Sequence, residues 1–275
     1  MSSLPLTRQL TSANPAGFER ATKHPFLKAA GEGQVATEKL SRWLAQDRLY
    51  AQAYVRFIGG LLTKLDLPPC NPDSKQCRSR TTEERILEIL VDSLNNIQRE
   101  LQFFDDVALE YGLDLTAVAC SPKDEPFLAP GVFAPNAITR AYIDLFMSAS
   151  SPGSTLLEGL AVLFATEYVY LHAWTYAASV MATSTADSMQ QPSPASFSTG
   201  VLVDADGGAL RRKFIPNWSS PEFKKYVDTL RDVTDELAGR LKGAEEMERA
   251  KGKCVAWWRH ILWLEERFWP DVDAS

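Results

Sequence analysis

The segment from Thr155 to about Thr183 constrains the fold most, because it has the composition of one long helix that is apolar on nearly every side. Such a helix has no polar face to turn to water, so it is expected in the middle of a bundle of other helices. Polar residues interrupt every apolar run of the chain before it reaches the roughly 20 residues that a membrane span needs. The segment therefore predicts a buried central helix and no membrane partner.

The rest of the chain also has the spacing of amphipathic helices, and it lacks the alternating runs with hairpin turns that predict a sheet. Thr37 is a predicted N-cap, and Thr81 with Glu84 has the pattern of a capping box. Ser220 precedes a proline, which is typical of a helix start. Besides the central segment, the predicted helices cover approximately residues 16–22, 26–30, 37–65, 81–111, 136–149, 220–243 and 244–269.

No shift in composition marks a domain boundary in the 275 residues. We expect one all-α domain of about seven or eight helices over residues 16–270. A flexible N-terminal tail, 1–15, and a C-terminal tail, 271–275, are predicted to flank it. The run 184–208 is polar and rich in serine and proline, which predicts a flexible surface loop within the domain.

Charge and cysteine usage exclude several classes of function. The net charge is −6, and the basic residues form no stripe, so nucleic-acid binding is disfavoured. The N-terminus lacks an apolar signal core, which predicts a cytoplasmic protein. The four cysteines have no CxxC spacing and no neighbouring histidine, so we expect no metal and no cofactor. Cys70 and Cys77 flank a polar loop, and whether they form a disulfide is left open, although a cytosolic setting favours free thiols.

Two carboxylates stand on helix faces that are otherwise apolar. Asp47 shares its face with Trp43, Tyr50 and Tyr54. Glu265 lies in the same kind of setting in the last helix, with aromatic residues around it. Taken singly, each is most simply a buried polar group with a satisfied partner. Together they predict an aromatic, partly polar pocket that holds an amino-substituted heteroaromatic ring, which stacks on the aromatic faces and donates to a carboxylate.

Three stretches of the sequence resemble the TenA/thiaminase II family, in the right order from about Phe18 to Trp269. They read HPFLKAAGEGQVATEKLSRWLAQDRLYAQAYVRF, FIPNWSSPEF and LEERFW. The resemblance implies a single haem-oxygenase-like helical bundle that is a homodimer or homotetramer. It also implies an enzyme that hydrolyses thiamine or its breakdown products. The implied reaction displaces an amine from the methylene carbon of a 4-amino-2-methylpyrimidine.

The resemblance also implies roles for particular residues. Asp47 matches the aspartate that holds the aminopyrimidine, and Tyr50 matches the tyrosine one turn later. Tyr142 matches a pocket tyrosine, and Tyr170 matches the tyrosine four residues after the family's nucleophile. Glu265 matches the catalytic glutamate of the last helix.

Two positions depart from the bacterial pattern. Thr166 stands where the thiaminase II branch has its nucleophilic cysteine, and Trp218 stands where that branch tends to have a tyrosine. Both departures point to the branch that lacks the cysteine. Glu167 is a second candidate carboxylate, although its place one residue after Thr166 favours a direction away from the pocket.

Three functional hypotheses follow from these residues. The preferred one is an aminopyrimidine hydrolase of the salvage type, in which Asp47 and Glu265 act without a thiol. The alternative is a non-catalytic pyrimidine-binding or regulatory protein on the same scaffold, because one fold can host many functions. The third hypothesis, haem binding through His24, would rest on the likeness of fold alone.

Overall fold

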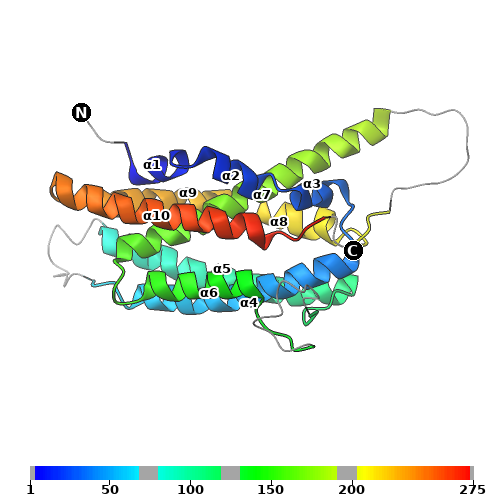
Figure 1. Ribbon diagram of the computed structural model, residues 1–275, viewed down its shortest axis with the longest axis horizontal. Helices are drawn as coiled ribbons and strands as arrows, with labels where there is room; N and C mark the ends of the chain where they lie inside the picture. The colour runs from blue at the N-terminus through cyan, green and yellow to red at the C-terminus, as the bar shows by residue number, and fades with distance from the viewer. Residues whose placement is uncertain (1–3, 68–79, 119–130, 191–202, 273–275) are drawn as a thin grey trace, which may run out of the picture.

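The computed structural model describes residues 4–67, 80–118, 131–190 and 203–272, and most of them lie in helices (Figure 1). This part of the chain contains no strand, so the all-α prediction is confirmed. The α-helices are α1 (Leu6–Ser12), α2 (Pro15–Thr22), α3 (Pro25–Glu32), α4 (Thr37–Leu62), α5 (Thr82–Tyr111), α6 (Ala137–Ser150), α7 (Leu156–Gln190), α8 (Ile215–Trp218), α9 (Pro221–Ala238) and α10 (Ala244–Phe268). A π-helix, η3 (Leu210–Phe214), leads directly into α8.

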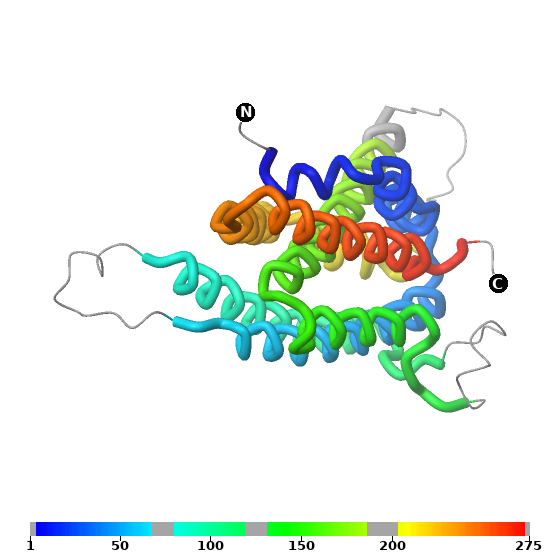
Figure 2. The backbone as a smooth tube through the Cα atoms, turned by 60° about the vertical axis from the view of Figure 1, so that its left-hand side comes forward, coloured from blue at the N-terminus to red at the C-terminus, as the bar shows by residue number. Residues whose placement is uncertain are grey.

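The apolar helix α7 runs obliquely through the molecule. Helices α4, α5 and α6 lie on one side of it, and α1, α2, α9 and α10 lie on the other (Figure 2). By length and composition its segment Leu156–Thr185 could cross a membrane, but 72% of the most apolar window is buried by the other helices. This is the burial expected of a central core helix.

Several helix boundaries follow from local chemistry. The capping box of Thr81 and Glu84 is present at the start of α5, and Gly112, with φ 67°, ends that helix. Ser220 accepts a hydrogen bond from the Phe223 amide at the start of α9. The prediction for Thr37 was wrong, because the N-cap position is Ala36 and the Thr37 hydroxyl donates to the Ala205 carbonyl instead.

The predicted tail and loop are both more ordered than their sequences indicate. The tail 1–15 contains α1, in which Leu10 is fully buried and Thr7 donates from its amide and hydroxyl to Asp235, at 2.8 and 2.7 Å. In the run 184–208, α7 continues as far as Gln190. The Ala205 amide then donates to the Gly33 carbonyl, which ties residues 203–208 to the end of α3. Residues 191–202 lie outside the described part, as do Cys70, Cys77 and Cys120.

His24 has a structural role at the start of α3. Its Nδ1 accepts a hydrogen bond from the Phe26 amide, as an N-cap side chain does. This contact accounts for a histidine directly before a proline without any ligand.

The close approach of α3 to α7 depends on Gly31. A Cβ at this position would lie 2.5 Å from the Ala177 carbonyl oxygen and 2.8 Å from the Val180 side chain. We expect Gly31→Ala to lower the free energy of unfolding by about 1–3 kcal/mol, because overpacking forces the helices apart. Urea denaturation, followed by circular dichroism, measures this change in the free energy of unfolding.

The matched control is Gly59→Ala in α4, where nothing lies within 4 Å of the added carbon. This change is expected to raise the free energy of unfolding by about 0.5–1 kcal/mol, since alanine is the better helix former. Equal destabilisation by both substitutions would contradict the role assigned to Gly31.

Candidate functional site

A cavity of about 710 Å³ lies between α4, α5, α7, α8 and α9. This volume is in the range of small-molecule sites, which is ~300–1,000 Å³. Exposed residues of α5 and α9, among them Arg99 and Lys225, form its rim, so the cavity opens between these two helices. Five residues singled out from the sequence line it together: Asp47, Tyr50, Thr166, Tyr170 and Trp218.

Asp47 is buried on the α4 wall of the cavity, with 4% of its surface exposed. The Tyr170 hydroxyl donates to its Oδ2 at 3.2 Å. Burial raises the pKa of Asp47 well above its usual range, and the nearby carboxylates of Glu100 and Glu265 raise it further. Asp47 is therefore suited to exchange hydrogen bonds with a ligand in either protonation state.

Glu265 and Tyr142 lie next to the cavity but outside its lining. The Tyr142 hydroxyl donates to Glu265 Oε2, and both side chains are buried. The ring of Tyr50 packs edge-on against Tyr142, with 5.1 Å between the ring centroids. Because Tyr50 itself lines the cavity, it stands between the cavity and the Tyr142–Glu265 pair.

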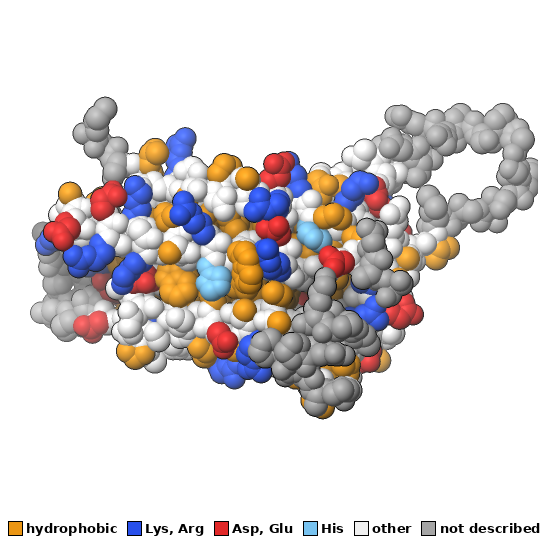
Figure 3. Space-filling model, in the orientation of Figure 1, with side chains coloured by type: hydrophobic (Ala, Val, Ile, Leu, Met, Phe, Trp, Pro, Cys, Tyr) orange, Lys and Arg blue, Asp and Glu red, His pale blue; other side chains and the backbone are white. Residues whose placement is uncertain are grey.

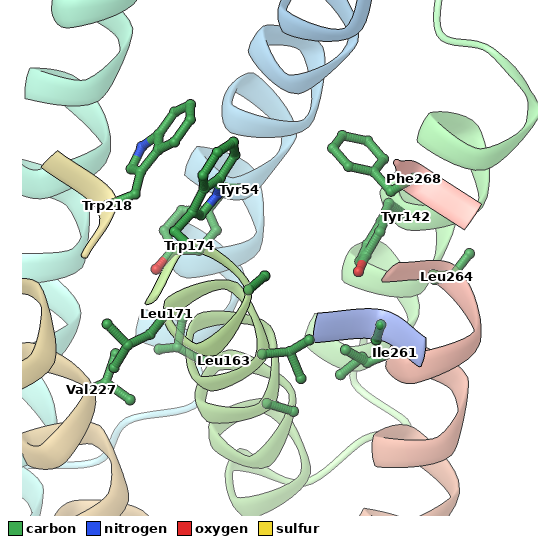
Figure 4. Packing of buried hydrophobic residues seen from close by; sticks show 14 of the residues in the cluster. Tyr54, Tyr142, Leu163, Leu171, Trp174, Trp218, Val227, Ile261, Leu264 and Phe268 are labelled. Carbon is green, nitrogen blue, oxygen red and sulfur yellow. The ribbon is translucent and has the colours of Figure 1, made fainter. Parts of the chain in front are cut away.

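The surroundings of Glu265 are apolar on the α10 side. Figure 4 shows Tyr142 close to Phe268 and Leu264, while Trp218, Trp174 and Tyr54 gather on the opposite side of the view. The pKa of Glu265 is raised to about 7, mainly by burial and to a smaller extent by Glu167, against the opposing effect of the hydrogen bond from Tyr142. A carboxyl group with this pKa can give up and take back a proton near neutral pH.

Thr166 makes contacts that account for its hydroxyl group. The hydroxyl donates to carbonyl oxygens one turn earlier in α7, at 3.2 Å to Val162 and 3.0 Å to Leu163. A threonine nucleophile needs an adjacent strong base to remove its proton. Here the hydroxyl donates to backbone carbonyl oxygens instead of to a base, so the geometry does not support attack by Thr166.

Glu167 lies in the cavity wall, although its place in the sequence favoured the opposite direction. Burial raises its pKa to about 7, the hydrogen bond with Tyr54 opposes the shift, and Glu100 adds to it. The Tyr54 hydroxyl also lies 3.1 Å from the Tyr226 hydroxyl, which is 2.6 Å from Ser93 Oγ. The prediction about Glu167 was therefore wrong, because the cavity wraps around two neighbouring faces of α7.

Glu100 of α5 is a further carboxylate of the cavity that the sequence reasoning missed. Its Oε1 accepts from the Trp218 indole, and its Oε2 accepts from the Asn217 amide at 3.1 Å. Burial raises the pKa of Glu100 to about 7 against the effect of these two bonds. The sequence does contain a pattern that could have indicated Glu100. Ile97, Glu100 and Phe104 share one helix face, so a carboxylate stands among apolar residues there, as it does at Asp47 and Glu265.

Four carboxyl groups with raised pKa values thus lie in or next to one cavity: Asp47, Glu100 and Glu167 line it, and Glu265 lies outside the lining. Within the described residues none of them forms an ion pair with a lysine, arginine or histidine. The same residues hold no group of three or more potential ligands arranged for a metal ion. The cavity is therefore acidic and aromatic, and its carboxyl groups Asp47 and Glu100 accept hydrogen bonds from hydroxyl, amide and indole donors.

Comparison with known proteins places these features in context. Residues 12–116 match the model of the TENA/THI-4/PQQC family. A Fusarium pseudograminearum protein called "Probable transcription factor" is 30% identical over 98% of this chain. The chain spans about half of that relative, 52% of its length. A Glycine max protein called "Probable bifunctional TENA-E protein" is 20% identical over 92% of this chain and 86% of the relative.

Solved structures share the fold. A TenA homologue from Pyrococcus furiosus is 22% identical, with a TM-score of 0.65 over 96% of this chain and 99% of that one. A TenA family transcription regulator from Silicibacter sp. TM1040 is 16% identical, also with a TM-score of 0.65, over 96% of this chain and 94% of that one. At this level of identity the likeness establishes the helical architecture.

Proposed function

We propose that this chain, whose residues 12–116 match the model of the TENA/THI-4/PQQC family, is a hydrolase of aminopyrimidines derived from thiamine and acts without a cysteine nucleophile. The resemblance read from the sequence motifs is confirmed by that match. The observation that carries the proposal is a buried Asp47 in the cavity wall that interacts electrostatically with a buried Glu265, which lies behind the Tyr50 ring. The name of the Glycine max relative is in keeping with a thiamine-related role.

Asp47 would bind the pyrimidine end of the substrate. A carboxyl group with a raised pKa can donate its proton to a ring nitrogen and accept from the neighbouring 4-amino group. Its Oδ2 already accepts from Tyr170, which fixes the orientation of the carboxyl plane. The aromatic rings of Tyr170 and Trp218, which also line the cavity, offer faces on which the pyrimidine can stack.

Glu265 would move the proton during hydrolysis. As the bond between the methylene carbon and the amine nitrogen breaks, protonated Glu265 gives its proton to the leaving nitrogen. A water molecule forms the new carbon–oxygen bond and passes a proton to the Glu265 carboxylate, which restores the starting state. This step requires the Tyr50 ring to move aside, because Tyr50 stands between Glu265 and the cavity.

A second candidate function is ligand binding without catalysis. Its support is the Thr166 hydroxyl, which is bonded to its own helix where a nucleophile would be needed. Two similar proteins also carry names that refer to transcription. On this reading the same cavity senses a pyrimidine, and Asp47 keeps its binding role.

Incubation with three compounds separates the two functions. Thiamine, formylaminopyrimidine and aminopyrimidine are each mixed with the protein, and hydroxymethylpyrimidine is measured by chromatography. We expect its release from at least one compound, and its absence from a parallel sample of the Glu265→Gln variant, which controls for contaminating hydrolases. Tight binding with no product in any sample would establish the binding protein instead.

We further propose that the protein works in the cytoplasm as a homodimer or homotetramer, with a small aminopyrimidine as its partner. Apolar side chains gather on the face of the molecule that carries α10 and α6 (Figure 3). In α10 itself, Trp263 is 46% exposed, which supports a self-association surface. Light scattering after gel filtration measures the assembly.

A further inference from the structure

Glu100 is held in the cavity from one side only. Its two oxygens accept from adjacent residues at the end of α8, the Asn217 amide and the Trp218 indole. A carboxylate has about four acceptor positions, so two donors leave half of them unused. Since Glu100 lines the cavity and is half-buried rather than buried, these unused positions are available to a ligand.

The surroundings of Glu100 favour positive charge in the ligand. Asp47 and Glu167 line the cavity as well, and both interact electrostatically with Glu100. The exposed carboxylates of Asp92 and Glu222 lie at its rim. The basic residues of the lining, Arg99 and Lys225, are exposed at the rim. The Arg99 guanidinium donates to Asn96 on its own helix. A cation inside the cavity would therefore meet carboxyl groups on several sides and aromatic faces between them, a setting that attracts cations.

We propose that Glu100 is a specificity-determining residue that receives the amine end of the ligand and selects a positively charged amine over a neutral group of the same size. The inference rests on the proposed function, because it assumes that the pyrimidine end is bound at Asp47. The position of Glu100 suits it to bind the amine end of the ligand, opposite the pyrimidine end. It belongs to α5, whereas Asp47 belongs to α4, so the two carboxyl groups can grip different parts of one molecule.

None of the other carboxyl groups in or next to the cavity has the same combination of features, and two of them, Asp92 and Glu222, are exposed at the rim. Asp47 is buried and bonded to Tyr170, and Glu265 lies outside the lining and is bonded to Tyr142. Glu167 interacts with Tyr54 within the wall. Glu100 is the lining carboxylate whose position is fixed by two donors from one short helix, so its orientation does not depend on the ligand.

The test compares two probes that share one pyrimidine ring. Aminomethylpyrimidine carries a protonated amine at pH 7.5, whereas hydroxymethylpyrimidine is neutral and of nearly the same size. Dissociation constants are measured by calorimetry for the wild type and for Glu100→Gln. We expect the substitution to weaken binding of the aminomethyl probe by about 10- to 100-fold, and binding of the hydroxymethyl probe by less than about 3-fold.

Two further variants separate charge from structure. Asp106→Asn removes one negative charge from an exposed position of the same helix, outside the cavity, and is expected to leave both constants unchanged. Glu100→Asp keeps the charge but is too short to keep both bonds to α8. It should retain a preference for the charged probe if the charge selects. If it loses this preference as completely as Glu100→Gln does, Glu100 has only a structural role.

The outcomes distinguish this inference from the function on which it rests. Equal weakening of both probes by Glu100→Gln, or no change in either, overturns the role of Glu100 while pyrimidine binding by the wild type stands. Failure of the wild type to bind either probe overturns both the proposed function and the selection by Glu100.

Discussion

Replacing Glu265 with glutamine is expected to slow hydrolysis of an aminopyrimidine by about 10²- to 10⁴-fold, which is the usual contribution of a general acid and base. Glutamine has nearly the same shape and can still accept from Tyr142, but it cannot give a proton to the leaving amine. Because Glu265 lies outside the cavity lining, binding of the pyrimidine should change little. Steady-state kinetics measures the first effect, and calorimetry with hydroxymethylpyrimidine measures the second.

The matched control is Glu266→Gln, one residue further along α10. Glu266 pairs with Arg20 at the surface, at 3.0 Å, so the same chemical change occurs away from the cavity. It should leave turnover intact. If Glu265→Gln also leaves turnover intact, the proton transfer belongs to another carboxyl group. Glu167 would then be the first to replace, because it lines the cavity and also has its pKa raised to about 7.

Replacing Asp47 with alanine is expected to weaken pyrimidine binding by about 10²- to 10³-fold, because two hydrogen bonds to the ring are lost together. Replacing it with asparagine should weaken binding by less than about tenfold. The amide can donate to the ring nitrogen and accept from the 4-amino group, as a neutral carboxyl does. Calorimetry with hydroxymethylpyrimidine measures both variants, and thermal unfolding checks that each remains folded.

The contrast between the two Asp47 variants reports the protonation state of the site. Burial and the neighbouring carboxylates raise the pKa of Asp47 well above its usual range, which favours the neutral form. If asparagine weakens binding as severely as alanine does, then Asp47 binds as a carboxylate to a protonated ring. Retention of full affinity in both variants would remove Asp47 from the binding site.

Local signals in the sequence predicted much of the fold. The capping box at Thr81 and the Ser220 cap were readable because their partners lie three residues away. The apolar pattern of α7 indicated its central place. The helix α1 was missed, because Leu6 and Leu10 are too few to show a period, and its other support is Asp235, more than 200 residues distant. That contact exists only in the folded chain.

In the candidate site too, the residues marked by a local sequence pattern could be predicted, whereas those that depend on distant contacts could not. Asp47 stood out because a carboxylate interrupts an aromatic face, and the fold brings it together with Tyr170 and Trp218 on one cavity. Glu100 has a comparable pattern on α5, but its meaning depends on donors from α8, more than 100 residues away. The position of Glu265 behind Tyr50 also depends on how α4, α6 and α10 pack, which no spacing within one helix can indicate.

The carboxyl groups around the cavity, which form no ion pairs with the described basic residues, cause the ligand-free protein to bind protons near neutral pH. The folded state raises the pKa of Glu100, Glu167 and Glu265 from 4.5 to about 7, so between these values it binds more protons than the unfolded chain does. By linkage, these groups lower the free energy of unfolding as pH rises through that interval, and the loss is complete above it. A cationic ligand that enters the cavity favours the ionised carboxylates, so it is exchanged for protons rather than simply added. The acidic groups without cationic partners therefore lower the free energy of unfolding of the ligand-free protein, and a bound cation opposes this loss.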